Sequence, residues 1–160
     1  MGRERLWVKA AEWFARVAFA AVFVVNVMCA VQFVVEPAAF TGAYELAGAG
    51  VAGEAAVRGI GIAFLMWNAT YPAFIVAPSR FRVLGWVILA QQAIGLVGES
   101  LLLAGLPAGH DVLAASVVRF IAFDGAGLVL MGVAFACMLV SRKAGRLPQR
   151  QASTSEINVQ

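Results

Sequence analysis

Four long apolar runs constrain this chain more than any other feature of its sequence. They cover about residues 13–35, 56–76, 83–106 and 112–140. A helix needs roughly 20 mainly apolar residues to cross a bilayer, and in lipid its backbone hydrogen bonds are satisfied internally. Hydrophobic residues make up 62% of the chain and charged residues 13%, against roughly 45–50% and 25% in soluble domains. The sequence therefore predicts an all-α, polytopic membrane protein with a bundle of four transmembrane helices.

Prolines and polar turns mark the ends of these runs. Glu36-Pro37 ends the first helix, because proline disfavours helical backbone at the residue before it. The connection that follows is expected to be partly ordered, with Phe40 and Tyr44 at the lipid interface. Within the second run Pro72 cannot bond the carbonyl of Asn68, so a kink is predicted there. That kink leaves a polar oxygen inside an apolar segment.

Basic residues gather on one side of the predicted bundle. Arg3, Arg5, Lys9, Arg80, Arg82, Arg142, Lys143, Arg146 and Arg150 fall on this side, whereas Glu36, Glu45, Glu54, Asp111 and Arg58 fall on the other. Because basic loops stay in the cytoplasm, both termini are predicted to be cytoplasmic. Residues 1–12 then form a cytoplasmic basic segment, residues 13–140 the membrane domain of a multi-pass cell-membrane protein, and residues 141–160 a cytoplasmic basic, disordered tail.

Several chemistries lack the residues they need. Cys29 and Cys137 fall at different depths of the bundle, so a disulfide between them is not expected. His110 is the single histidine and lies in a turn, which argues against a haem held by two histidines. No cluster of residues has the spacing of metal ligands. The Gly48–Gly53 string has no preceding strand and so is not a dinucleotide motif. We expect no cofactor, no metal and no nucleic-acid partner.

A few polar residues inside the apolar runs would have to support any activity. The candidates for a buried polar network are Arg58, Asn68, Gln91, Gln92, Glu99, Arg119 and Asp124. Ionisable groups at such depth are costly and by default face the protein interior, pair with each other or line a pathway. Glu99 and Arg119 lie about 10 Å below the same ends of adjacent helices. Equal depth predicts an ion pair between them.

Asp124 is the residue of this set best placed for a function. The antiparallel register of the last two helices sets it opposite Ile94, within a turn of Gln91 and Gln92. Arg119 lies about 140° around the helix and cannot readily pair with it. Two interpretations stay open: a protonated carboxyl that donates one interhelical hydrogen bond, or a group that exchanges a proton in a polar cavity.

The layout of the chain resembles a known family. Glu36-Pro37, Phe40 and Gly42 occupy a loop after the first helix, Arg58-Gly59-x-Gly61 opens the second helix, and two further helices and a basic tail follow. This order resembles that of the small bacterial four-helix membrane proteins of the DoxX-like kind. The resemblance implies a four-helix fold in a bacterial inner membrane, and for some members an accessory role in quinone or sulfur oxidation.

Two classes of function remain. The first is a non-enzymatic accessory subunit or small carrier or channel, acting in the bilayer as a homo-oligomer or within a larger membrane complex. The second is a small membrane enzyme that acts on a lipid-like or quinone-like substrate, with Glu99 and Asp124 as acid and base near Trp67. A closed pocket would favour the enzyme, a polar path at an oligomer axis would favour transport, and a dry paired network would favour the accessory role.

Overall fold

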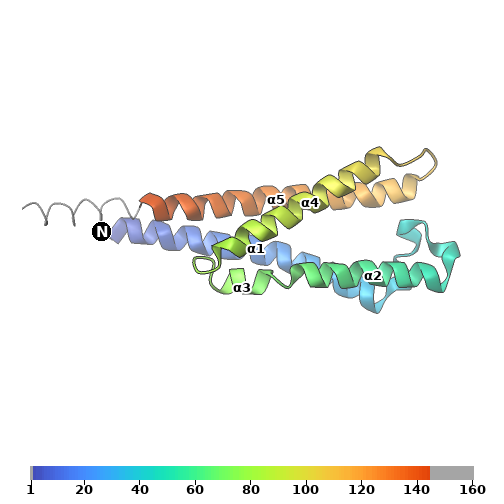
Figure 1. The fold of residues 1–160 in the computed structure, drawn as a ribbon, viewed down its shortest axis with the longest axis horizontal. Coiled ribbons are helices and arrows are strands. Elements are labelled where there is room, and N and C mark those ends of the chain that lie inside the picture. Colours follow the sequence, from blue (N-terminus) through green and yellow to red (C-terminus); the bar gives the residue numbers. More distant parts are fainter. Residues whose placement is uncertain (1, 145–160) are drawn as a thin grey trace, which may run out of the picture.

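The computed structural model describes residues 2–144, and this part of the chain is helical without strands (Figure 1). The α-helices are α1 (Gly2–Val35), α2 (Val51–Asn68), α3 (Tyr71–Val76), α4 (Arg82–Ala104) and α5 (Asp111–Ala144). Three short 3-10 helices connect α1 to α2, namely η1 (Pro37–Ala39), η2 (Gly42–Tyr44) and η3 (Ala47–Ala49). The end of the predicted tail, residues 145–160, lies outside the described residues.

Within residues 2–144, four segments are long and apolar enough to cross a membrane, as predicted: Arg5–Val35, Val51–Val76, Arg82–Ala104 and Asp111–Ala144. Their boundaries differ from the predicted ones chiefly at the basic ends. α1 already begins at Gly2 and α5 continues to Ala144. The reason is that Arg, Lys, Glu, Leu and Ala are strong helix formers, so a helix does not stop where its hydrophobicity does.

The helices run back and forth between two ends of an elongated bundle (Figure 1). One end, the termini end, holds the start of α1, the turn between α3 and α4, and the end of α5. The opposite loop end holds η1 to η3 and the turn between α4 and α5. α1 is central, since it packs against α2, α3 and α5, while α4 packs mainly on α5. A Cβ on Gly61 would lie 2.8 Å from the carbonyl oxygen of Ala30, so glycine permits the close approach of α2 to α1.

The second membrane-length segment is broken, as predicted from its proline. α2 ends at Asn68 and α3 begins at Tyr71, with Pro72 in its first turn. Proline lacks the N–H that would bond the carbonyl one turn earlier. The side chain of Asn68 is held separately, because its Nδ2 donates to the carbonyl oxygen of Phe64 at 2.8 Å. The break places a buried asparagine and a buried tyrosine next to each other in the middle of the bundle.

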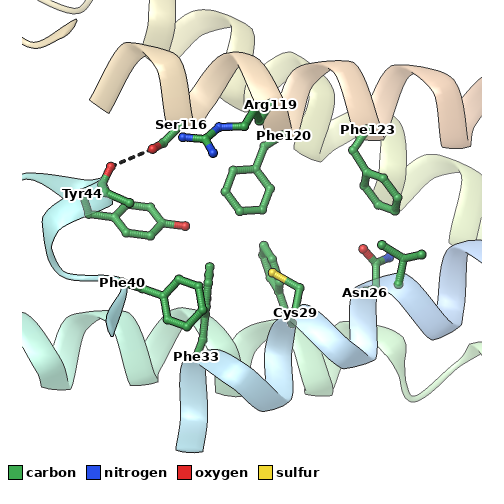
Figure 2. Close-up of a pocket in the computed structure, with 12 residues that line it drawn as sticks. Asn26, Cys29, Phe33, Phe40, Tyr44, Ser116, Arg119, Phe120 and Phe123 are labelled. Atoms are coloured by element: carbon green, nitrogen blue, oxygen red, sulfur yellow. Dashed lines mark hydrogen bonds between the residues drawn. The ribbon is translucent and has the colours of Figure 1, made fainter. Parts of the chain in front are cut away.

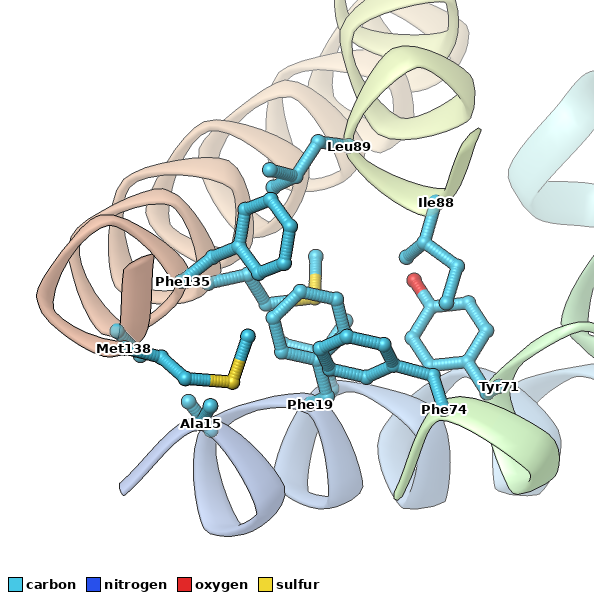
Figure 3. Packing of buried hydrophobic residues seen from close by; sticks show 12 residues of the cluster. Ala15, Phe19, Tyr71, Phe74, Ile88, Leu89, Phe135 and Met138 are labelled. Carbon is cyan, nitrogen blue, oxygen red and sulfur yellow. The ribbon is translucent and has the colours of Figure 1, made fainter. Parts of the chain in front are cut away.

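The termini half of the bundle is filled by aromatic and sulfur-containing side chains (Figure 3). Phe19 of α1 lies at its centre, with ring centroids 4.3 Å from Phe74 and 6.3 Å from Phe135. Met131 and Met138 of α5 close the cluster and are fully buried. Offset and tilted aromatic pairs of this kind add about 0.5–1.5 kcal/mol each beyond the area they bury. These buried side chains hold the termini halves of α1 and α5 together with α3 and the start of α4.

The connection between α1 and α2 is better ordered than the sequence suggested. Phe40 and Tyr44 turn inward onto Phe33 of α1, with ring centroids 4.7 and 5.8 Å away. The prediction that these two rings lie at a lipid interface is therefore wrong. The three successive 3-10 helices bend the segment back over the bundle. The bend is held at Thr41, whose carbonyl oxygen accepts from the backbone N–H of both Tyr44 and Leu46. The segment forms one wall of a cavity.

Candidate functional site

The loop half of the bundle contains a partly open cavity of about 240 Å³ lined by α1, α2, η2, α5 and Phe40, which follows η1 (Figure 2). Its walls are mainly apolar and aromatic, and they consist of Val25, Asn26, Cys29, Phe33, Phe40, Ala43, Tyr44, Phe64, Ser116, Arg119, Phe120 and Phe123. Ligand pockets typically have volumes of roughly 300–1,000 Å³ and mostly apolar linings with a few polar groups. This cavity is slightly smaller and has the same character.

Tyr44 presents its hydroxyl to the cavity, and Arg119 lies beside Ser116 at the loop end (Figure 2). Ser116 Oγ donates to the carbonyl oxygen of Ala43 at 2.8 Å, which ties η2 to α5. Burial raises the pKa of the Tyr44 phenol, and Cys29 and Glu99 raise it further. The phenol therefore stays protonated and can donate a hydrogen bond to a bound molecule.

Glu45 fastens the η2 segment to the start of α5. Its carboxylate accepts from the backbone N–H of Leu113 at 3.1 Å and contacts Nδ1 of His110. These hydrogen bonds lower the pKa of Glu45, that with His110 most strongly. Glu45 also has a left-handed backbone with φ 57°, a conformation that a side chain other than glycine rarely adopts. The carboxylate thus holds in place the wall that carries Tyr44.

A small polar recess of about 40 Å³ adjoins the cavity and shares Asn26, Phe64 and Phe120 with it. The rest of its lining is Trp67, Asn68, Gln92, Gly95, Glu99 and Asp124. Of the predicted network, the structure therefore brings together Asn68, Gln92, Glu99 and Asp124. Gln91 lies outside this recess and pairs with Thr70, whose hydroxyl is 3.4 Å from its Oε1.

A line of hydrogen bonds joins three helices beside the recess. The Tyr71 hydroxyl donates to Gln92 Oε1 at 3.5 Å, and Gln92 Nε2 donates to Asp124 Oδ1 at 2.8 Å. The predicted register is thereby confirmed at Asp124, which faces α4 within two residues of Ile94. Gly95 makes room for this carboxyl, because a Cβ there would lie 2.9 Å from Asp124 Oδ2. Asp124 is thus aligned by Gln92 and reaches the recess.

Two buried oxygen atoms of the recess have no hydrogen-bond partner among the described residues. They are Oδ1 of Asn68 and Oε2 of Glu99. The Asn68 side chain is 4% exposed, and its amide nitrogen is already used by Phe64. A buried polar atom without a partner costs about 1–3 kcal/mol. Two such atoms lining one recess indicate a place where another molecule supplies the missing partner.

The predicted ion pair between Glu99 and Arg119 is wrong. Within residues 2–144, Arg16 forms an ion pair with Glu12 and the ring of His110 contacts Glu45, but no ion pair joins Glu99 to Arg119. Arg119 is exposed and donates from Nε to the carbonyl oxygen of Ala115, its own helix neighbour. Equal depth placed the two groups at the same height, but rotation of α5 turns Arg119 away from Glu99 and towards the mouth of the cavity.

Arg58 does not join the network either. It is exposed at the loop end, and its Nε donates to the carbonyl oxygen of Val34 at 3.2 Å. That oxygen belongs to the last turn of α1, where helix carbonyls lack partners in their own helix. The guanidinium of Arg58 therefore stabilises the end of α1, and the prediction that Arg58 belongs to a buried polar network is wrong.

Sequence reasoning missed four polar residues that line or support the site, namely Asn26, Tyr44, Tyr71 and Ser116. Asn26 lines both the cavity and the recess, and its signal was a lone amide in the middle of an apolar run. Tyr71 lies next to the proline of α3 and is fully buried. Tyr44 had no such signal, because only the folding of the connection brings it inward.

A second space of about 720 Å³ lies at the termini end between α1 and α5. It is lined by small and apolar side chains, with Cys137 and Ser141 as its most polar members. The hydroxyl of Ser141 is already bonded to the carbonyl oxygen of Met138. None of the residues described in the lining of this groove has a buried polar atom without a partner, so the smaller cavity with its recess is the better candidate for specific binding.

No group of three or more His, Cys, Asp or Glu side chains that could hold a metal occurs in residues 2–144. Comparisons with protein-family models, with curated proteins and with solved structures found no match to this chain. The function is therefore inferred from the chemistry of the cavity and the recess.

Proposed function

We propose that this chain is an integral membrane protein whose four long helices cross the bilayer with both termini in the cytoplasm. Large apolar side chains point away from the bundle along these helices, such as Val129, Val133 and Val140 of α5. The charges of the two ends differ: Arg5, Lys9, Arg80, Arg82, Arg142 and Lys143 lie at the termini end, and Glu36, Glu45, Glu54 and Asp111 at the loop end. This asymmetry supports the orientation.

Reporter fusions test the orientation. Alkaline phosphatase is active only outside the cytoplasm, so it is expected to be inactive when fused after Gln160 and active when inserted at Gly48, which is exposed between η2 and α2. A fluorescent protein that folds only in the cytoplasm should give the opposite pattern. Phosphatase activity from the C-terminal fusion would contradict the proposed topology.

The function that the geometry supports best is binding of a small lipid-like molecule, as a carrier or as an accessory subunit of a membrane complex. The observation that carries this proposal is an aromatic-lined cavity that shares a wall with a polar recess containing unpartnered oxygen atoms. A molecule with an apolar body and one polar group fits both parts. Such a protein keeps the four-helix character expected from the DoxX-like layout, and association with a second copy or a larger complex is part of the proposal.

Binding of a naphthalene-bearing alcohol tests this function. Protein in lipid nanodiscs is dialysed against tritiated 1-naphthylmethanol, and the uptake of protein-free nanodiscs is subtracted. We expect saturable binding near one molecule per chain. Cys29→Trp should abolish it by filling the cavity, whereas Met28→Trp, on an exposed position of the same helix, should preserve it. Absence of saturable binding, or equal binding by the two variants, would contradict the proposal.

An enzymatic role is the second candidate, because Glu99 and Asp124 line the same recess. Two carboxyl groups at one site can act as acid and base in a proton transfer. Protein incubated in D₂O with 1-naphthylacetone, a ketone with exchangeable protons beside its carbonyl, would then speed deuterium incorporation. Catalysed exchange that Asp124→Asn removes would favour the enzyme. A bound ketone that exchanges no faster than in protein-free nanodiscs would favour the binding protein.

A further inference from the structure

The recess is rich in hydrogen-bond acceptors and acidic groups, and none of the residues described in its lining is a cation. We infer that the molecule bound in the cavity is an apolar amine whose protonated, N–H-bearing nitrogen lies in the recess between Asp124, Glu99 and Asn68. This inference rests on the proposed binding function and names the chemical class of the ligand.

The charges around the recess come from two helices. α4 supplies Glu99 and α5 supplies Asp124, while the groups that face the site from α1, α2, α3 and η2 are Asn26, Cys29, Asn68, Tyr71 and Tyr44. Of the side chains that line the two spaces in residues 2–144, Arg119 is the only cation, and it lies at the loop end beside Ser116. Carboxyl groups buried without a cation need either a proton or a positively charged ligand. A bound ammonium group supplies that charge.

Hydrogen bonding favours the same class of ligand. The Asn68 amide nitrogen is used by Phe64, so the side chain offers its unpartnered Oδ1 as an acceptor. Oε2 of Glu99 is likewise free, and Asp124 keeps Oδ2 beside Gly95. A primary ammonium carries three N–H donors and no acceptor. A quinone or ketone carries acceptors alone and would leave these oxygens without partners.

The size and the walls of the recess also suit an ammonium group. A space of about 40 Å³ holds a few groups the size of a water molecule, at about 10–15 Å³ each. The rings of Trp67, Phe64 and Phe120 line it, and aromatic faces attract cations. The larger aromatic cavity next to it then takes the apolar body of the amine.

The test compares three molecules with the same ring system. 1-Naphthylmethylamine is protonated at neutral pH, 1-naphthylmethanol is neutral, and the N,N,N-trimethyl derivative of the amine is charged but has no N–H. Each is tritiated and dialysed against the full-length protein in nanodiscs of uncharged phosphatidylcholine. We expect the amine to bind about tenfold or more tightly than the alcohol, as charge-assisted hydrogen bonds allow. The trimethyl derivative should bind more weakly than the amine.

Single substitutions assign the preference to the recess. Asp124→Asn and Glu99→Gln should each reduce the preference for the amine about tenfold while changing the affinity for the alcohol about twofold or less. Asp111→Asn, which removes an exposed carboxylate of the same helix α5, should leave the preference unchanged. If Asp124→Asn fails to fold, Glu99→Gln and the comparison of ligands on the unaltered protein still decide the question.

Equal affinities for the amine and the alcohol would overturn the inference and leave the binding function standing. A trimethyl derivative that binds as tightly as the amine would also overturn it, because no N–H donor would then be needed. If neither the amine nor the alcohol binds in a saturable way, the proposed binding function itself fails.

Discussion

Gly95→Ala is predicted to close the recess from the side of α4. The added methyl group would lie 2.9 Å from Asp124 Oδ2 and 3.1 Å from the Trp67 ring. Ordinary contacts begin at 3.4 Å, so the carboxyl must move by about 0.5 Å and the ring by about 0.3 Å. The carboxyl has little freedom to move, because its Oδ1 is held by Gln92 at 2.8 Å. The substitution therefore strains the hydrogen bond that aligns Asp124.

The expected magnitude follows from three contributions. Replacing glycine by alanine inside a helix stabilises it by about 1 kcal/mol. Overpacking opposes this by about 1–3 kcal/mol, and loss of an interhelical hydrogen bond adds about 0.6 kcal/mol. We therefore expect Gly95→Ala to lower the free energy of unfolding by about 1–2 kcal/mol. Gly98→Ala is the matched control one turn along α4, where nothing lies within 4 Å of the added methyl group, and it should raise that free energy by about 1 kcal/mol.

Unfolding by SDS in mixed micelles, followed by tryptophan fluorescence, measures both variants against the unaltered protein. Dialysis with tritiated 1-naphthylmethylamine then compares their affinities, and Gly95→Ala should weaken binding about tenfold while Gly98→Ala leaves it unchanged. If Gly95→Ala is as stable as Gly98→Ala and binds the amine as the unaltered protein does, the described packing of Asp124 against Gly95 is refuted.

Three further predictions concern the loop, the core and the cavity mouth. Because hydrogen bonds lower the pKa of Glu45 below its ordinary 4.5, its stabilising effect is complete above that value and is lost as pH falls through the lowered pKa. Limited proteolysis of residues 36–50 should accelerate in that acidic range, and Glu45→Gln should already be cleaved faster at neutral pH. Phe19→Ala should lower the free energy of unfolding by about 3 kcal/mol, which is the low end of the range for such substitutions because lipid also solvates the unfolded chain. Val17→Ala, at an exposed site of the same helix, should change it little. Arg119→Gln should change stability by about 0.5 kcal/mol or less, as measured by SDS unfolding.

Each of these three predictions has a result that would contradict it. Cleavage of residues 36–50 that is independent of pH would show that Glu45 does not fasten the segment, with Glu54→Gln as the control for loss of a carboxylate nearby. Equal costs for Phe19→Ala and Val17→Ala would contradict the described core. A loss of about 3–5 kcal/mol in Arg119→Gln would indicate a buried ion pair after all.

The sequence sufficed for the features that depend on hydrophobicity and depth along the helices. Apolar runs predicted the four long helices, and Pro72 predicted the break after Asn68. A short turn between two antiparallel helices sets their relative height, which explains why Asp124 was correctly placed beside Gln92. Height along a helix follows from counting residues, and counting needs no knowledge of the partner's side chains.

The sequence did not suffice for features that depend on rotation and on the path of a loop. Arg119 has the right height to meet Glu99, but the packing of α5 turns it elsewhere. All sides of a membrane helix are apolar, so its pattern does not say which face points inward. The inward turn of Tyr44 depends on its contact with Phe33 and on the hydrogen bonds that its neighbours Ala43 and Glu45 make with Ser116 and Leu113, all of which are distant in sequence. These contacts arise only in the folded chain.

Photoaffinity labelling tests the central claim, that the loop half holds a ligand site, most directly. Protein in nanodiscs is irradiated with a diazirine derivative of 1-naphthylmethylamine, and the labelled peptides are mapped by mass spectrometry. The cavity predicts label in residues 25–33, 40–44 and 116–123, and excess unlabelled amine should suppress it. Label concentrated in the groove at the termini end, in residues 7–14 and 136–144, or label that excess amine does not suppress, would contradict the claim.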